Sequence, residues 1–288
     1  MITKPSRLVN AHPIASLIGV GILVAGGLLI AIGSSNNAPS SSLVTCSNNQ
    51  ASDTKALQTA ISSTTTNGVV NIASGTCALS ANLPIHRAMT VNGAGAQLTF
   101  LVQHADANIF QITAPGVTIE SINLDTGTFH PGIPPVKKSP VSAVLFSASS
   151  NTTVRDVTAK AGSGFGMRIT GPSPCSSFGT RGTIVQNVIV SNTGQGGFTA
   201  LDIDCTNGAT LSGITIDGDY LALFQDTNVT LNGLAYTPRS KGCQFAVYGT
   251  GPLINVAITN VSGGGGVKLA GTPITNVTQT QVTKAKGC

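Results

Sequence analysis

The chain has few charged and few aromatic residues. Of 288 residues, 15 are Lys or Arg and 10 are Asp or Glu, so 9% are charged, whereas an ordinary soluble domain has about 25%. Tryptophan is absent, and there are nine Phe and three Tyr. Coiled coils and long-helix proteins need abundant charged helix formers, and strongly charged disordered chains need a large net charge. The composition excludes all three classes.

Several functional motifs are also missing. The longest basic run is Lys137-Lys138 and the net charge is only +5, so the chain lacks the electrostatic footprint of a nucleic-acid-binding protein. No C-x-x-C pair occurs, which argues against a zinc ribbon or a thioredoxin motif. There is no nucleophile elbow, and Gly263–Gly266 lacks the Lys-Ser/Thr of a phosphate-binding loop.

The cysteines point to an oxidising compartment. An even number downstream of an apolar N-terminal segment predicts up to three disulfides, and buried free thiols are the alternative. About 15 pairings are open to six cysteines, and the sequence does not choose among them. The candidates are Cys46, Cys77, Cys175, Cys205, Cys243 and Cys288.

An uncharged apolar segment runs from Ile14 to Gly33. About 20 residues at about 1.5 Å each span the roughly 30 Å core of a bilayer. Lys4 and Arg7 precede the segment, so we expect a cytoplasmic N-terminus and an extracytoplasmic bulk, at the cell surface or in the periplasm. We interpret the segment as an uncleaved transmembrane anchor, with a signal peptide cleaved near Ala31-Ile32-Gly33 as the alternative, because the segment exceeds a usual h-region.

The predicted organisation has three parts. Residues 1–33 form a cytoplasmic stub and a transmembrane helix, and the Ser/Asn-rich residues 34–51 form a linker. Residues 52–288 form the extracytoplasmic domain. This domain opens with an amphipathic helix at about 53–62, where Ser52 or Asp53 can accept hydrogen bonds from the free amides of the first turn.

Beyond this helix a short pattern recurs: apolar, any residue, Asn/Asp/Gly/Ser, apolar. Its starts are 35, 31, 26, 20, 22 and 21 residues apart, and a period settling near 20–22 indicates one repeated supersecondary unit. β-Branched residues alternating with Gly and Asn turns are typical of short strands. The pattern therefore predicts a parallel β-helix whose ends need covering, the first by the helix and the last by Thr283–Cys288. It begins at Ile119, Val154, Val185, Leu211, Leu231, Leu253 and Ile274.

Residues 53–101 resemble the opening of the pectate-lyase-like superfamily. The matching elements are the cap-helix sequence Asp53–Ile61, the strand Val69–Ile72, the turn Gly75-Thr76 and the coil Val91–Gly95. The resemblance implies a single-stranded right-handed parallel β-helix with an N-terminal capping helix. That fold hosts lyases, hydrolases, epimerases, phage tailspikes, adhesins and catalytically silent proteins, and its enzymes act on polysaccharides with clustered carboxylates, basic residues and sometimes calcium.

Two close pairs of aspartates are the candidate catalytic residues: Asp202 with Asp204, and Asp217 with Asp219. Residues i and i+2 of a strand share a face, so each pair can place two carboxylates together as acid and base or as Ca²⁺ ligands. Ordinary turn chemistry is the alternative. We predict no metal site and no cofactor, with Ca²⁺ at these carboxylates as the alternative.

Basic residues in the same broad stretch, namely Lys160, Arg168 and Arg181, fit either a base beside the acids or a solvated surface. Four asparagines fit the Asn-x-Ser/Thr pattern of glycosylation acceptors; they are Asn151, Asn228, Asn260 and Asn276.

Three functions remain open. Three features favour a structural, surface-filament or accessory subunit of a membrane or envelope assembly, with other protein subunits as partners. They are the low charge, the small number of aromatic side chains that could stack on a sugar ring, and the apparent anchor. The alternatives are an exported polysaccharide lyase or hydrolase and a non-catalytic glycan-binding adhesin.

Overall fold

A computed structural model describes residues 39–105, 107–126, 143–171, 175, 180–195, 199–238, 244–271 and 273–287. The predicted anchor 14–33, Cys243 and Cys288 lie outside these ranges. No helix within them is long and apolar enough to span a membrane.

The strands form two parallel sheets, which we call the large sheet and the small sheet. The large sheet contains β1 (Ser41–Val44), β2 (Gly68–Ile72), β3 (Gly75–Leu79), β5 (Met89–Gly93), β6 (Thr99–Gln103), β8 (Val117–Glu120), β9 (Asn123–Asp125), β11 (Thr153–Arg155), β12 (Thr158–Ser163), β14 (Thr180–Gln195), β16 (Thr206–Gly218), β18 (Thr227–Pro238), β20 (Leu253–Ser262) and β22 (Ile274–Thr283). The small sheet contains β4 (Leu83–Ile85), β7 (Phe110–Ile112), β10 (Ala143–Ser147), β13 (Phe165–Thr170), β15 (Leu201–Asp204), β17 (Leu221–Phe224), β19 (Val247–Thr250) and β21 (Val267–Ala270).

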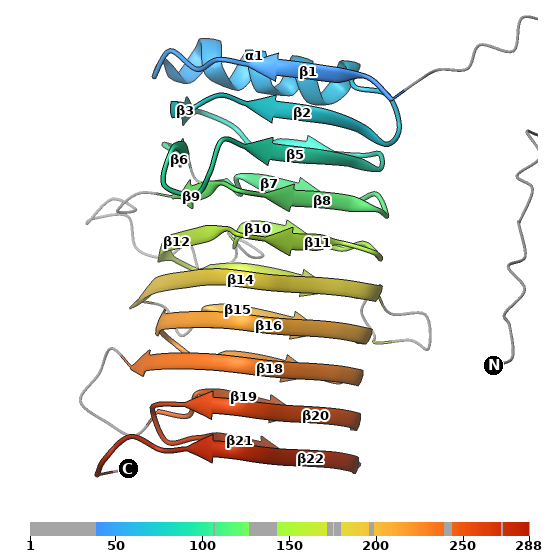
Figure 1. Ribbon diagram of the computed structural model, residues 1–288, viewed down its shortest axis with the longest axis vertical. Coiled ribbons are helices and arrows are strands. Elements are labelled where there is room, and N and C mark those ends of the chain that lie inside the picture. Colours follow the sequence, from blue (N-terminus) through green and yellow to red (C-terminus); the bar gives the residue numbers. More distant parts are fainter. Residues whose placement is uncertain are drawn as a thin grey trace, which may run out of the picture. The chain divides into compact units, whose positions relative to one another are not determined.

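Successive coils stack on one another, as Figure 1 shows. The chain runs through the large sheet, turns, crosses the small sheet and returns one coil further along, so neighbouring strands are parallel. β11 pairs with the first part of β14, and β12 pairs with its second part. Each long strand of the large sheet therefore bends and forms two sides of its coil. The predicted parallel β-helix is thereby confirmed.

Two columns of left-handed residues form the corners of the coils. One lies at the bend inside the long strands, at Ser121, Asp156, Asn187, Gly213, Gly233, Asn260 and Gln281. The other lies just before β8 and β11 and near the start of each later long strand, at Gly116, Asn151, Gly182, Gly208, Asn228, Asn255 and Asn276. Glycine and asparagine tolerate positive φ best, which explains the polar third position of the sequence pattern.

The pattern misassigned the register of the last two repeats. Leu231 pairs with Ile258, and Ile258 pairs with Gln279. The predicted starts at Leu253 and Ile274 belong to the other corner, where Asn255 and Asn276 have the same left-handed conformation. Because both corners carry the same residue types, a short pattern cannot tell them apart.

Inward side chains of successive coils stack into one continuous core. One column runs through Val91, Ile119, Val154, Val185, Leu211, Leu231 and Ile258, all of them buried. Outside this core, asparagine amides also stack, with Asn276 donating to Asn255, Asn255 to Asn228 and Asn228 to Asn207. Stacking of like side chains needs few charges, which accounts for the low charge of the chain.

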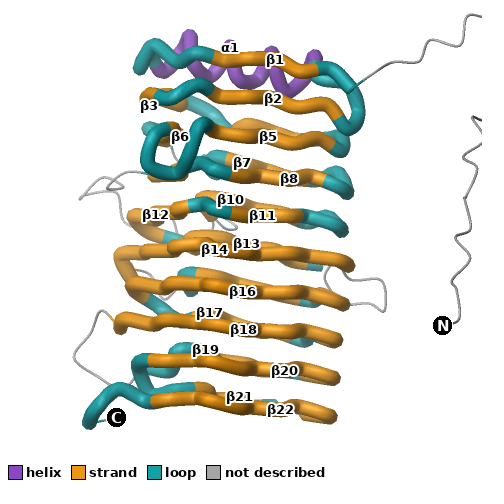
Figure 2. The backbone as a smooth tube through the Cα atoms, viewed as in Figure 1, coloured by secondary structure: helices purple, strands orange, loops and turns teal. Residues whose placement is uncertain are grey.

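The first coil is covered by α1 (Gln50–Ser63), which buries Leu57 and Ile61 against the core. Figure 2 shows this helix across the end of the stack. The predicted capping residues are wrong: Asn49 is the N-cap, and its Oδ1 accepts from the amide of Ser52. The predicted linker also ends earlier than expected, because β1 pairs with β2. A parallel sheet edge offers backbone partners to any nearby segment, whatever its composition.

Asp53 does not cap the helix; it connects α1 to the segment before the helix and to β3. Its carboxylate accepts from the amides of Ser47, Asn49 and Ala78 at 2.8, 3.0 and 3.1 Å, and from the Ser47 hydroxyl at 2.9 Å. The disulfide Cys46–Cys77 ties the same segment to β3. At the other end, β22 pairs with β20 and most of its residues are exposed, while the amide of Ala285 donates to Gly264.

Candidate functional site

The outward face of the small sheet carries the candidate site. Its strands alternate, so Leu201 and Ile203 of β15 face the core while Asp202 and Asp204 point outward. Arg168 of β13 lies directly beside Asp202 in the ladder, and Thr170 lies beside Asp204. On the other side of Asp202 follow Ala222, Tyr248 and Lys268, one from each successive strand.

Arg168 contacts both carboxylates. Its Nη2 donates to Oδ2 of Asp204 at 3.0 Å, and its Nε lies 3.0 Å from Oδ2 of Asp202. The second contact is an ion pair without the alignment of a hydrogen bond, because Nε has no acceptor with suitable geometry. The guanidinium also packs over Phe165, with Cζ 5.1 Å from the ring centroid. One positive charge is therefore held between two acids.

The pKa of Asp202 is raised to about 6. Burial is the main cause, since the residue is only 7% exposed, and the neighbouring charge of Asp204 acts in the same direction. The Arg168 guanidinium opposes them and lowers the pKa. Asp202 can therefore gain or lose a proton near neutral pH, which a general acid or base requires.

Asp204 is held by further neighbours. It is 9% exposed and lies 3.3 Å from the Thr170 hydroxyl, which donates to it. Its Oδ1 lies 3.1 Å from Sγ of Cys205, and Cys205 forms a disulfide with Cys175. Asp204, Cys175 and Cys205 form a cluster of potential metal ligands. Disulfide sulfurs carry no thiolate, however, so the cluster does not fit a metal ion.

Two tyrosines and a lysine extend the same face. The rings of Tyr220 and Tyr248 pack edge to face at 5.6 Å between centroids. Lys268 Nζ lies 5.1 Å from the ring centroid of Phe245 and 5.8 Å from that of Tyr248. Burial raises the pKa of Tyr220, and the charges of Asp219 and Asp202 raise it further, so both acids lie near this ring.

The two predicted aspartate pairs have different surroundings in the structure. Asp202 and Asp204 share one guanidinium. Burial raises the pKa of the Tyr220 and Tyr236 hydroxyls, and the charge of Asp219 raises both further. Asp217 is exposed at the end of β16, where its backbone pairs with Ser191 and Thr237 of the large sheet. The catalytic role of all four stays a prediction.

Other predicted residues have definite places. The two disulfides confirm four of the six cysteine candidates, and Cys243 and Cys288 lie outside the described residues. The four glycosylation candidates are exposed corner residues, and their modification stays a prediction. A further buried acid, Asp226, accepts from the amides of Thr206 and Phe224 at a corner. Its pKa is raised well above the usual range by burial, and these bonds oppose the shift.

Nothing in the sequence analysis favoured Arg168 or Lys268 over other surface residues. A usable signal exists for Arg168: Met167–Thr170 and Leu201–Asp204 have the same apolar-polar-apolar-polar pattern, and this alignment pairs Arg168 with Asp202. The contact between Tyr220 and Tyr248 could not be predicted either, because 28 residues separate them in the sequence.

No family model matches the chain, and no curated protein matches it. Similar solved structures include the pectin methyl esterase of rice weevil, with a TM-score of 0.40 and 12% identity over 72% of this chain and 74% of that chain. A PL6 polysaccharide lyase of Pseudopedobacter saltans has a TM-score of 0.40 and 10% identity over 77% of this chain and 64% of the lyase. The ORF18 protein of Geobacillus virus E2 has a TM-score of 0.38 and 11% identity, covering 83% and 59%. Likeness at this level gives no information on the activity or substrate of this chain.

Proposed function

We propose that the chain is an exported enzyme of the polysaccharide lyase or hydrolase class that acts through the outward face of the small sheet. The observation that carries the proposal is the pair Asp202 and Asp204 on one guanidinium, with the pKa of Asp202 raised to about 6. A carboxyl that titrates near neutral pH can both donate and accept a proton, which acid–base catalysis requires.

Each residue has a role in this proposal. Asp202 transfers the proton to or from the sugar. Arg168 positions both carboxylates and stabilises negative charge that develops on the substrate. Tyr220 and Tyr248 contact the sugar, since an aromatic ring offers an apolar face and a polar edge. These residues lie on strands or immediately before one, so the backbone ladder keeps them in place.

The test is turnover of acidic and neutral polysaccharides, followed by new reducing ends and by unsaturated products. We expect Asp202→Asn to lower the rate by about 100-fold or more, because the amide cannot transfer the proton. Asp156→Asn is the matched control: Asp156 is an exposed left-handed corner residue, and its partner Asn187 still finds an acceptor oxygen. Equal rates for Asp202→Asn and the wild type would refute the proposal, and glycan binding without any product would identify an adhesin.

We further propose that the domain is extracytoplasmic and tethered by residues 14–33. Two disulfides support an oxidising compartment. A tethered domain of this kind can also act as a structural or accessory subunit of an envelope assembly. The test is native fractionation: we expect the chain in the membrane fraction until detergent is added, whereas recovery only as a soluble, N-terminally trimmed monomer would exclude the tether.

A further inference from the structure

The surroundings of Asp202 are short of positive charge. Among the described residues, Arg168 is the only cation within ion-pair distance of Asp202, and the same guanidinium pairs with Asp204. One positive charge therefore faces two carboxylates. Lys268 lies three strands away from Asp202, and its ammonium group is placed over two aromatic rings.

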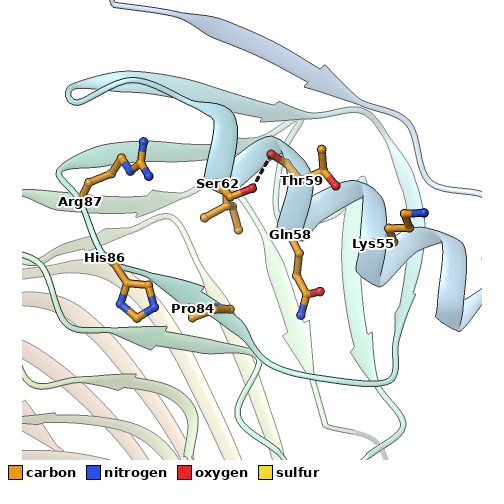
Figure 3. A pocket seen from close by; sticks show the side chains of 8 residues that line it. Lys55, Gln58, Thr59, Ser62, Pro84, His86 and Arg87 are labelled. Atoms are coloured by element: carbon orange, nitrogen blue, oxygen red, sulfur yellow. Dashed lines mark hydrogen bonds between the residues drawn. The ribbon is translucent and has the colours of Figure 1, made fainter.

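The exposed cations of the first coils are remote from this site. Figure 3 shows Lys55 and Arg87 beside α1, where they line a pocket with the segment that follows β4. Arg87 donates to the carbonyl of Thr64 at 3.0 Å. Because β7, β10 and β13 separate β4 from β15, the two places lie about 19 Å apart along the stack, at about 4.8 Å per strand. These cations therefore cannot neutralise a group that binds at Asp202.

A small side chain, that of Ala222, lies beside Asp202 on the strand that follows β15. Tyr248 comes next in the same ladder. Phe224, two residues further along β17, shares this face and is 37% exposed. The ring of Tyr220, two residues before Ala222, contacts that of Tyr248 at 5.6 Å between centroids. The methyl group of Ala222 is therefore shorter than all these neighbours, and three of them are aromatic.

We propose that the sugar unit bound over Ala222, beside Asp202, is neutral and that the bond next to it is hydrolysed. The inference rests on the proposed function and selects one of its two reaction classes. Aromatic rings supply contacts for the C–H groups of an uncharged sugar. A sugar carboxylate at this position would instead meet two carboxylates that already share one guanidinium, and like charges placed together weaken binding.

The charge of the site also fits hydrolysis better than elimination. In hydrolysis the glycosidic C–O bond breaks, water adds to the anomeric carbon, and positive charge develops on the sugar in the transition state. One carboxyl gives its proton to the leaving oxygen and a second carboxylate takes a proton from the water; Asp202 and Asp204 supply this pair. Of the two roles proposed for Arg168, hydrolysis needs the positioning of these carboxylates. Elimination develops negative charge beside a sugar carboxylate, which a guanidinium shared by two acids neutralises poorly.

The experiment measures binding of glucose pentamers to the full chain in neutral detergent at pH 7. The pentamers are linked α-1,4, β-1,4 or β-1,3, and each is used in its neutral form and with every C6 oxidised to a carboxylate. Tyrosine fluorescence reports binding in the first milliseconds after mixing, before a pentamer is consumed; the chain has no Trp and three Tyr, and two of these lie at the site. We expect at least one neutral pentamer to bind at least about 10-fold more tightly than its oxidised partner.

Two variants test the position and the charge. Ala222→Leu should weaken binding of the neutral pentamer about 10-fold, because the longer side chain occupies the place of the sugar. The control Ala235→Leu, at an exposed alanine of β18, should leave it unchanged. Asp204→Asn removes one of the two acids, and we expect it to tighten binding of the oxidised pentamer about 3-fold or more. Retained binding of the neutral pentamer shows that this variant is folded.

The products of longer chains of the same linkage score the reaction class, and we expect new reducing ends without unsaturated products. Tighter binding of an oxidised pentamer than of its neutral partner would overturn the inference. So would unsaturated products, unchanged binding in Ala222→Leu, no gain in Asp204→Asn, or no binding of any pentamer. Binding of a neutral pentamer without any product would support the neutral-sugar site and refute the proposed enzyme.

Discussion

Asp53 and Asp202 are two buried aspartates with opposite pKa shifts. Asp53 is 2% exposed and Asp202 is 7% exposed, so burial alone raises the pKa of both. At Asp53, hydrogen bonds from the amides and hydroxyl of its neighbours outweigh burial, and the pKa is lowered. At Asp202, one guanidinium that makes no aligned hydrogen bond does not outweigh burial and a second carboxylate.

The difference lies in what surrounds each carboxylate. Fixed backbone N–H groups stabilise the charged form of Asp53 and make it a joint between the N-terminal segment, α1 and β3. Asp202 has a single cation shared with Asp204. The same residue type therefore serves as a structural anchor at one end of the stack and, in the function proposed above, as a proton carrier on the small sheet.

The largest expected effect comes from removing the shared cation. Arg168→Met leaves two buried carboxylates without a positive partner, and we expect the free energy of unfolding at pH 7 to fall by about 3 to 5 kcal/mol. The loss should shrink at pH 5, because without Arg168 the pKa of Asp202 rises further and the carboxyl is protonated. Urea denaturation at both pH values measures this; an equal loss at both would show that the guanidinium acts through packing alone.

Asp53→Asn tests the other member of the comparison. The amide keeps the shape but loses the charge, so we expect a loss of about 2 to 3 kcal/mol at pH 7 from weakened charge-assisted hydrogen bonds. Because the pKa of Asp53 is lowered, its contribution is present above about pH 4 and is lost as pH falls through the native pKa. Asp156→Asn is the control, with an expected change below about 0.5 kcal/mol. A loss for Asp53→Asn that stays the same as pH falls would contradict this assignment.

For Asp202 we expect the opposite pH dependence of the unfolding free energy. Its native pKa of about 6 exceeds the value of about 3.9 in the unfolded chain, so the native state binds more protons between these values. The unfolding free energy should therefore fall by about 2 kcal/mol as pH rises from 4 to 6. The measured quantity is the difference in this slope between the wild type and Asp202→Asn. Parallel curves for the two proteins would rule out a raised pKa.

The smallest expected effect lies at the edge of the small-sheet site. Lys268→Gln removes the cation over Phe245 and Tyr248, and we expect a loss of about 0.5 to 1 kcal/mol in stability. Lys268→Arg should retain it. The pKa of Asp202, followed by NMR, should not move in either variant, since Arg168 and not Lys268 faces that carboxylate. A shift would extend the electrostatic site across three more strands, from β15 to β21.

Much of the fold was predictable from the sequence. The recurring Asn, Asp and Gly positions identified corners of a parallel β-helix, and the helix over 53–62 was found because Leu57 and Ile61 share a face. The register of the last coils was not predictable, because Asn255 and Asn187 look alike in sequence yet belong to different corners. The capping residue was missed because three polar residues, Asn49, Ser52 and Asp53, all fit a helix start.

The sequence by itself determined that Asp202 and Asp204 share one face of a strand, since side chains alternate along any strand. It also determined that a chain of this composition builds stacked coils rather than helices. Only the tertiary structure decided that Arg168, 34 residues before Asp202, lies beside it and that Asp217 does not join them. Loop lengths between coils set which strands become neighbours, and burial together with the shared cation then sets the pKa of Asp202.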